Sequence, residues 1–99
     1  MATSKEFKTF ILEQLSLLDN IKCRPMMGGY LLYYKDCLFG GLYQERLMVK
    51  KVEENKKFNL IEDNPYEGAK PMYLIEELDN REHLRDIIIS TYEGLINIK

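Results

Sequence analysis

The feature that most constrains this chain is a run of short apolar segments that polar pairs interrupt at close intervals. The apolar segments are Tyr30–Tyr34, Cys37–Tyr43 and Arg46–Val52, and the pairs between them are Lys35-Asp36 and Gln44-Glu45. Short aromatic and aliphatic segments joined by two-residue polar turns are typical of antiparallel strands. We therefore predict a meander of three strands at the centre of the chain.

The N-terminal residues have the period of an α-helix. Thr3 and Glu6 form a capping-box pattern, in which each side chain bonds a free backbone amide at the helix start. Apolar residues then recur at spacings of three and four until Asp19-Asn20, where we expect the helix to end. The residues of this apolar stripe are Phe7, Phe10, Ile11, Leu15 and Leu18.

The second half of the chain continues the alternation between helix and strand. Glu53–Ile61 is predicted as a short helix, Tyr66–Gly68 as a brief strand and Pro71–Glu76 as a longer strand. Asp79 then caps a last helix, in which Gly94 is tolerated either by close packing or by fraying near the end. The predicted inward stripe of that helix is Leu84, Ile87, Ile88, Thr91, Tyr92, Leu95 and Ile96.

The order of these elements defines the expected fold class. Reading along the chain gives αβββαββα, an α+β fold with an antiparallel five-stranded sheet. A length of 99 residues fits a single domain that occupies residues 1–99.

Charge and hydropathy restrict the partners. A formal net charge of -2, with 45% hydrophobic and 30% charged residues, argues against a large basic surface for nucleic acid. We interpret the lysine cluster Lys50, Lys51, Lys56 and Lys57 as a solvated face, so direct nucleic-acid binding is not expected. The chain shows neither a signal-peptide pattern nor an apolar stretch of the roughly 20 residues that span a bilayer. We expect a cytoplasmic protein without membrane contact.

Histidine and cysteine, two residue types that often perform catalysis or bind metals, are sparse, whereas carboxylates are abundant. His83 is the single histidine, and no Ser/His/Asp set or spaced metal ligands accompany it. Cys23 and Cys37 fit no ligand motif; free thiols are the preferred interpretation, and a disulfide between them stays open. Lys22 and Arg24 flank Cys23, but a plain, partly buried cysteine is preferred over a redox-active one. We therefore predict no catalytic residue, metal or cofactor.

Two pairs of glycines punctuate the meander. Neither Gly28-Gly29 nor Gly40-Gly41 fits a phosphate-binding pattern. If Asp36-Cys37 forms the hairpin turn, Gly40 and Gly41 lie opposite Tyr33 and Leu32, where a glycine leaves room for a ring to lie over the backbone. We prefer this structural interpretation to ligand contact.

Tyrosines are unusually frequent, with seven in a chain that has no tryptophan. Because side chains alternate along a strand, Tyr33 and Tyr34 cannot share a face, so one ring is expected in the core and the other outward. Outward rings can bind a protein or stack on bases, and the net charge favours a protein. The candidate interaction surface is Tyr33, Tyr34, Tyr43 and Tyr73.

The stretches "TSKEF…ILEQL", "RPMMGGYLLYYKDCLFGGLYQERLMVKK" and "YEGAKPMYLIEEL" together resemble the TfoX N-terminal domain family. The signature residues of this resemblance are Arg24, Met26, Met27, Gly28, Gly29 and Tyr30. The resemblance implies a secretion-chaperone-like α+β fold with no established catalytic residues. It also implies a link to regulators of natural competence that act with the cyclic-AMP receptor protein. Longer members carry a helix-hairpin-helix-type C-terminal domain, which these 99 residues do not include.

These observations favour a non-enzymatic protein-interaction module that forms a homodimer. By resemblance, its partner is expected to be a cyclic-AMP-receptor-type regulator or RNA polymerase. The first alternative is a small-ligand-binding domain or an enzyme, which would need a pocket such as one formed by Arg24, Tyr30 and Glu76. The second alternative is nucleic-acid binding by the Lys50–Lys57 region.

Overall fold

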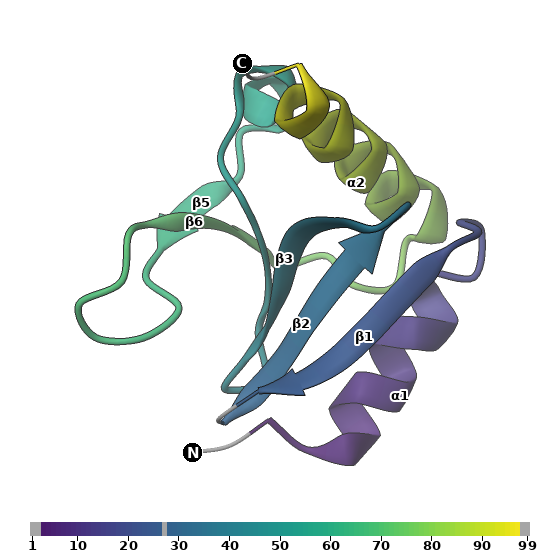
Figure 1. The fold of residues 1–99 in the computed structure, drawn as a ribbon, viewed down its shortest axis with the longest axis vertical. Helices are drawn as coiled ribbons and strands as arrows, with labels where there is room; N and C mark the ends of the chain where they lie inside the picture. Colours follow the sequence, from purple (N-terminus) through teal and green to yellow (C-terminus); the bar gives the residue numbers. More distant parts are fainter. Residues whose placement is uncertain (1–2, 27, 98–99) are drawn as a thin grey trace.

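The computed structural model describes residues 3–26 and 28–97, which form a six-stranded antiparallel sheet with two main helices (Figure 1). The strand order across the sheet is β1-β2-β3-β4-β6-β5. In Figure 1 the loop between β5 and β6 projects away from both helices. The elements are α1 (Lys5–Gln14), β1 (Ile21–Met26), β2 (Gly29–Tyr34), β3 (Cys37–Tyr43), β4 (Leu47–Val49), the 3-10 helix η1 (Glu53–Phe58), β5 (Ile61–Asp63), β6 (Met72–Ile75) and α2 (Arg81–Ile96).

The predicted α+β class and the central meander are confirmed. The strands β3 and β4 fall within their predicted segments, and β2 begins one residue before its segment, at Gly29. The backbone φ angles are 51° at Lys35, 65° at Asp36, 52° at Gln44 and 61° at Glu45. Positive φ at both central residues is the geometry of a type I′ hairpin turn. Both polar pairs therefore form the turns of the meander, and Cys37 lies in β3 instead of in the turn.

The predicted five-stranded sheet is wrong by one strand, because β1 precedes the meander. In β1 the inward Ile21 and Cys23 alternate with the outward Lys22 and Arg24. This two-residue period is that of a half-buried strand. Pro25 is compatible with it because β1 is an edge strand, where a missing N–H costs no ladder hydrogen bond.

The segment between β4 and β6 also differs from the prediction. The predicted helix over Glu53–Ile61 is only the 3-10 helix η1, and the brief strand lies at Ile61–Asp63 instead of Tyr66–Gly68. Asn59 explains the shift, since its left-handed conformation (φ 54°) ends η1 and turns the chain back. Residues 61–63 can then pair with β6, and residues 66–68 remain in the loop.

Both helices begin one residue later than predicted. Ser4, and not Thr3, caps α1, and its hydroxyl accepts a hydrogen bond from the Phe7 N–H at 3.1 Å. Asn80, and not Asp79, caps α2 through its side-chain oxygen. The regular part of α1 also ends earlier than expected, at residue 14, with turns continuing to residue 17.

The start of α1 is attached to the β3–β4 turn by Glu45. The Glu45 carboxylate accepts hydrogen bonds from the Ser4 N–H at 2.7 Å and from the Ser4 hydroxyl at 3.0 Å. In return, the Thr3 hydroxyl accepts from the Glu45 N–H at 3.4 Å. The carboxylate contact that the sequence assigned to Glu6 thus comes from a residue far along the chain.

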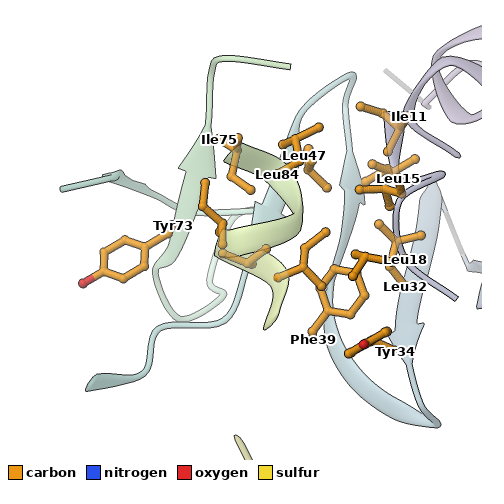
Figure 2. Packing of buried hydrophobic residues seen from close by; sticks show 14 residues of the cluster. Ile11, Leu15, Leu18, Leu32, Tyr34, Phe39, Leu47, Tyr73, Ile75 and Leu84 are labelled. Atoms are coloured by element: carbon orange, nitrogen blue, oxygen red, sulfur yellow. The ribbon is translucent and has the colours of Figure 1, made fainter. Parts of the chain in front are cut away.

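Both helices pack against one face of the sheet, which we call the inner face. Ile11 on α1 and Leu84 on α2 belong to the same buried cluster as Leu32, Leu47 and Ile75 from the strands. Figure 2 shows Ile11 of α1, and Leu15 and Leu18 just after that helix, close to Leu32 of β2. Of the predicted α1 stripe, Ile11, Leu15 and Leu18 are buried against the sheet, whereas Phe10 is partly exposed to solvent.

Gly94 is explained by close packing, one of the two reasons considered from the sequence. A Cβ atom at this position would lie 2.5 Å from Cγ2 of Val52 and 2.5 Å from a carboxylate oxygen of Glu54. The absence of a side chain lets α2 approach the start of η1.

Candidate protein-binding surface

The sheet face that points away from the helices, which we call the outer face, is apolar. Successive side chains of a strand point to opposite faces, and paired residues share a face, so the strand pairings assign its members. Its apolar members include Leu31, Tyr33, Leu38, Met48, Ile61, Met72 and Leu74, and the same pairings also place the charged Lys22, Arg24 and Asp63 on it. None of these seven apolar residues belongs to the core cluster that includes the helices. Met48 is completely buried at the centre of this face, while Ile61 at its edge is 53% exposed.

The register of β3 against β2 differs from the one predicted. A bulge between Leu32 and Tyr33 places Gly40 opposite Leu32 and Gly41 opposite Leu31. The expected position of Gly40 opposite Tyr33 is therefore wrong.

A glycine nevertheless makes room for a tyrosine ring on the outer face. A Cβ atom on Gly41 would lie 2.9 Å from the hydroxyl oxygen of Tyr43 and 3.0 Å from its ring, so the ring lies along its own strand across Gly41. A glycine in the sheet thus makes room for a tyrosine ring, as expected, but the ring belongs to Tyr43 and not to Tyr33.

Beside Tyr43 the outer face forms a groove of about 620 Å³. Tyr43 and Tyr66 line it, with ring centroids 6.3 Å apart and planes inclined by 53°. Its apolar lining includes Pro71 and Met72, and Met72 also belongs to the outer face. We call this depression the tyrosine groove.

The lining of the tyrosine groove is basic. Lys50, Lys51 and Lys70 contribute to it, and no acidic residue does among the parts of the chain that the structure describes. Lys51 is paired with Glu62 at 3.0 Å, and its ammonium lies 5.7 Å from the centroid of the Tyr73 ring. The predicted lysine cluster is therefore divided, since Lys56 and Lys57 lie on η1 and do not line the groove.

Arg46 holds the β5–β6 loop that forms one wall of the groove. Its guanidinium donates hydrogen bonds to the Asp63 carboxylate at 2.7 Å and to the carbonyls of Asn64 at 3.1 Å and Pro65 at 3.0 Å. Its Nε donates to the Tyr43 carbonyl at 3.1 Å. These bonds connect the loop to the β3–β4 hairpin and fix the position of the groove.

The four tyrosines nominated from the sequence divide between the two faces. Tyr34 and Tyr73 are only 8% and 7% exposed on the inner face, so a partner cannot reach most of either ring. Tyr33 and Tyr43 lie on the outer side and are half-buried. Sequence reasoning missed Tyr66, which is 56% exposed; its place between Pro65 and Gly68 was the available signal of a loop position.

Of the signature residues, Arg24 and Met26 lie on β1, Gly29 and Tyr30 begin β2, and Gly28 lies in the turn between the two strands. Met27 falls outside the described residues. The Arg24 guanidinium lies 6.0 Å from the centroid of the Tyr33 ring, and Met26 ends β1. Gly28 has a φ of 80°. A side chain on Gly29 would overlap the Leu42 carbonyl, so this glycine permits close strand approach.

The ligand pocket considered from the sequence does not form. Arg24 lies on the outer face, whereas Tyr30 packs against the core cluster on the inner face, with the Lys8 ammonium 5.3 Å from its ring centroid. Glu76 is exposed beyond the end of β6, on the other side of the sheet's centre. These three side chains do not converge on one cavity.

The two cysteines are unpaired. Cys23 is on β1 and Cys37 on β3, with β2 between them, so two strand spacings of about 4.8 Å each exceed the roughly 7 Å limit between disulfide-linked Cα atoms. Burial raises the pKa of the Cys23 thiol, and the charge of Lys8 only partly offsets this. The ammonium of the flanking Lys22 donates a hydrogen bond to the Asp36 carboxylate at 2.8 Å and is therefore directed away from the Cys23 thiol.

His83 lies beside the Phe58 ring, and its Nε2 is 4.0 Å from a carboxylate oxygen of Glu77. In residues 3–26 and 28–97, no group of three or more His, Cys, Asp or Glu side chains gathers as metal ligands would. Within the same ranges, no helix has the length and apolar character needed to cross a membrane.

The fold class is thus α+β, with two helices on the inner face of an open antiparallel sheet and an apolar outer face. The model of the TfoX N-terminal domain matches residues 13–94, and the chain belongs to this family. The chain is also 24% identical, over 98 residues, to a Spirochaeta aurantia protein described as an uncharacterized 12.7 kDa protein in the trpE 5′ region. That similarity covers 96% of this chain and 85% of the relative.

Proposed function

We propose that this chain is a non-enzymatic protein-interaction module that contributes to competence or transcription regulation by binding a protein partner. The observation that carries the proposal is the apolar outer face, which neither helix covers and which continues into the tyrosine groove. An apolar surface bordered by charged residues is the kind of surface that protein interfaces use. Here the border includes Arg24 at one edge and Lys50 at the groove.

Membership of a family associated with competence regulation supports the choice of partner. The first partner to test is a cyclic-AMP-receptor-type regulator, and the second is RNA polymerase. A second copy of the chain, as in the expected homodimer, is the alternative occupant of the outer face. The proposed setting is the cytoplasm, where the unpaired thiols of Cys23 and Cys37 stay reduced.

The test compares a charge placed on the outer face with the same charge placed on the helical side. Leu74→Glu changes a half-buried leucine of the outer face, and Leu17→Glu changes a leucine on the α1 side that is 48% exposed. Binding to the purified regulator and to RNA polymerase is measured by isothermal titration calorimetry. Leu74→Glu is expected to weaken binding at least about tenfold, because it places an unpaired charge in an apolar interface, whereas Leu17→Glu leaves binding unchanged.

Circular dichroism of both variants serves as the check on folding. Equal binding by Leu74→Glu and Leu17→Glu, with both variants folded, would exclude the outer face as the docking surface. Sedimentation of the chain alone distinguishes the homodimer: a dimer that Leu74→Glu dissociates identifies a second copy as the occupant. Failure of the unchanged chain to bind either partner would overturn the choice of partner.

A further inference from the structure

We propose that the tyrosine groove binds an acidic peptide segment of a protein partner, an extended stretch in which Asp or Glu side chains accompany an apolar one. This inference rests on the proposed function, because it names the chemistry of the segment that the partner would supply. Three features carry it: the charge of the groove, its apolar lining and its fixed shape.

The charge of the groove is opposite to that of the chain. The whole sequence has 16 acidic and 14 basic residues, yet the groove is lined by three lysines and by no acidic residue among the described parts. Of these lysines, Lys51 already pairs with Glu62, whereas Lys50 and Lys70 form no ion pair with the rest of the described chain. Their charge is therefore available to carboxylates of a partner.

The apolar lining fits a side chain between those carboxylates. Pro65, Pro71 and Met72 contribute apolar surface, and Met is an adaptable contact for varied side chains. Burial, and to a lesser extent the neighbouring Tyr66, raises the pKa of Tyr43. A tyrosine hydroxyl is protonated at neutral pH even without this shift, so the Tyr43 hydroxyl can donate a hydrogen bond to a carboxylate.

The groove is held in shape before any partner arrives. Besides the four hydrogen bonds of Arg46, the Asn64 side chain donates to the Ala69 carbonyl at 2.6 Å, and the Ala69 N–H donates to the Tyr66 carbonyl at 3.1 Å. A preformed site lowers the entropy cost of binding. The volume of about 620 Å³ is within the range of roughly 300–1,000 Å³ that ligand sites occupy.

A peptide fits these features better than a single-stranded nucleic acid does. Nucleic-acid grooves combine a continuous basic path with ring faces that are free to stack on bases. Here Lys57 and its neighbour Lys56 lie on η1 and do not extend the basic lining, and Tyr43 is half-buried and inclined against Tyr66. The basic surface of the groove is therefore too short to follow a nucleic-acid backbone. The half-buried ring of Tyr43 also offers little free surface on which a base could stack.

The test uses a fluorescein-labelled peptide, GDEFDLEEG, and its uncharged analogue GNQFNLQQG. Fluorescence anisotropy is expected to show at least about tenfold tighter binding of the acidic peptide at low salt, with the difference shrinking as ionic strength rises. In a ¹⁵N-labelled sample, the amide shifts caused by the acidic peptide are expected at Tyr43, Lys50, Tyr66 and Lys70.

Matched lysine variants locate the site. The double variant Lys50→Glu with Lys70→Glu is expected to reduce binding of the acidic peptide at least about tenfold. The double variant Lys56→Glu with Lys57→Glu, which changes the net charge equally but lies on η1 outside the groove, is expected to leave binding unchanged. The proposal would be overturned if the two peptides bound equally well, or if the groove and control variants lost the same affinity for the acidic peptide. It would also be overturned if the peptide shifted amides elsewhere on the chain. The same conclusion would follow if a twelve-base oligothymidine, added in place of the peptide, shifted the amide signals of the groove residues.

The inference and the proposed function can fail separately. If the double variant of Lys50 and Lys70 binds the purified regulator normally while Leu74→Glu does not, the outer face is the docking surface and the peptide proposal is wrong. If neither change affects regulator binding, the proposed function is wrong as well.

Discussion

Replacing Asn55 with alanine is expected to lower the free energy of unfolding by about 3–4 kcal/mol. Asn55 is completely buried, and its side-chain oxygen accepts a hydrogen bond from the Val52 N–H at 3.2 Å. Its amide nitrogen donates to the Lys50 carbonyl at 2.9 Å and to the Thr91 hydroxyl at 2.8 Å. The alanine variant leaves the Val52 N–H and the Lys50 carbonyl without these partners, whereas the Thr91 hydroxyl keeps its hydrogen bond to the Ile87 carbonyl at 2.8 Å. Each unsatisfied buried group costs about 1–3 kcal/mol.

The measurement is urea unfolding followed by circular dichroism, with Asn97→Ala as the matched control. Asn97 is exposed at the end of α2, and its replacement is expected to cost less than about 0.5 kcal/mol. For a domain of this size the Asn55→Ala loss corresponds to a fall in melting temperature of about 15–25 °C. A loss below about 1 kcal/mol would show that these hydrogen bonds do not hold η1 against α2.

The second large effect is expected for Gly40→Ala, which should cost about 3 kcal/mol. Gly40 is buried at the centre of the sheet and pairs with Val49 on β4. A Cβ atom there would overlap the Met48 carbonyl oxygen and lie 2.9 Å from the Val49 Cα. Because the obstacle is backbone, rotation of a side chain cannot relieve it, and β3 and β4 must move apart.

Gly68→Ala separates this steric effect from the general cost of replacing a glycine. Gly68 has a φ of 86°, and a Cβ atom there would have no neighbour within 4 Å. Its replacement is therefore expected to cost only the strain of the left-handed conformation, about 1 kcal/mol. The check is thermal unfolding of both variants. A Gly40→Ala variant no less stable than Gly68→Ala would mean that the strands tolerate a side chain at this position.

The parts of the fold that were predictable from sequence are those with local signals. Polar pairs at Lys35-Asp36 and Gln44-Glu45 set the hairpin turns, and a two-residue turn fixes the register next to it. The strand β1 was missed because Pro25 and the charged Lys22 and Arg24 obscure a short alternating pattern. Only its position at the sheet edge makes that composition acceptable, and edge position is a property of the assembled sheet.

The candidate site was less predictable, because it depends on contacts between distant residues. Alternation correctly separated Tyr33 from Tyr34, but it could not tell which face the helices cover. Tyr73 was nominated for the surface although it is buried, and Tyr66 was overlooked although it is exposed. The hydrogen bonds of Arg46 that hold Tyr66 beside Tyr43 join segments that no local pattern connects.

Methyl NMR mapping of the chain in complex with the purified cyclic-AMP-receptor-type regulator distinguishes docking on the outer face from docking on the helical side. Outer-face methyl groups of Leu31, Met72 and Leu74 report on one side of the sheet, and those of Leu12 and Leu17 report on the α1 side. We expect the regulator to perturb the first set of methyl groups and to leave the second set unchanged. Perturbations confined to the α1 side, with the outer face unaffected, would contradict docking on the outer face.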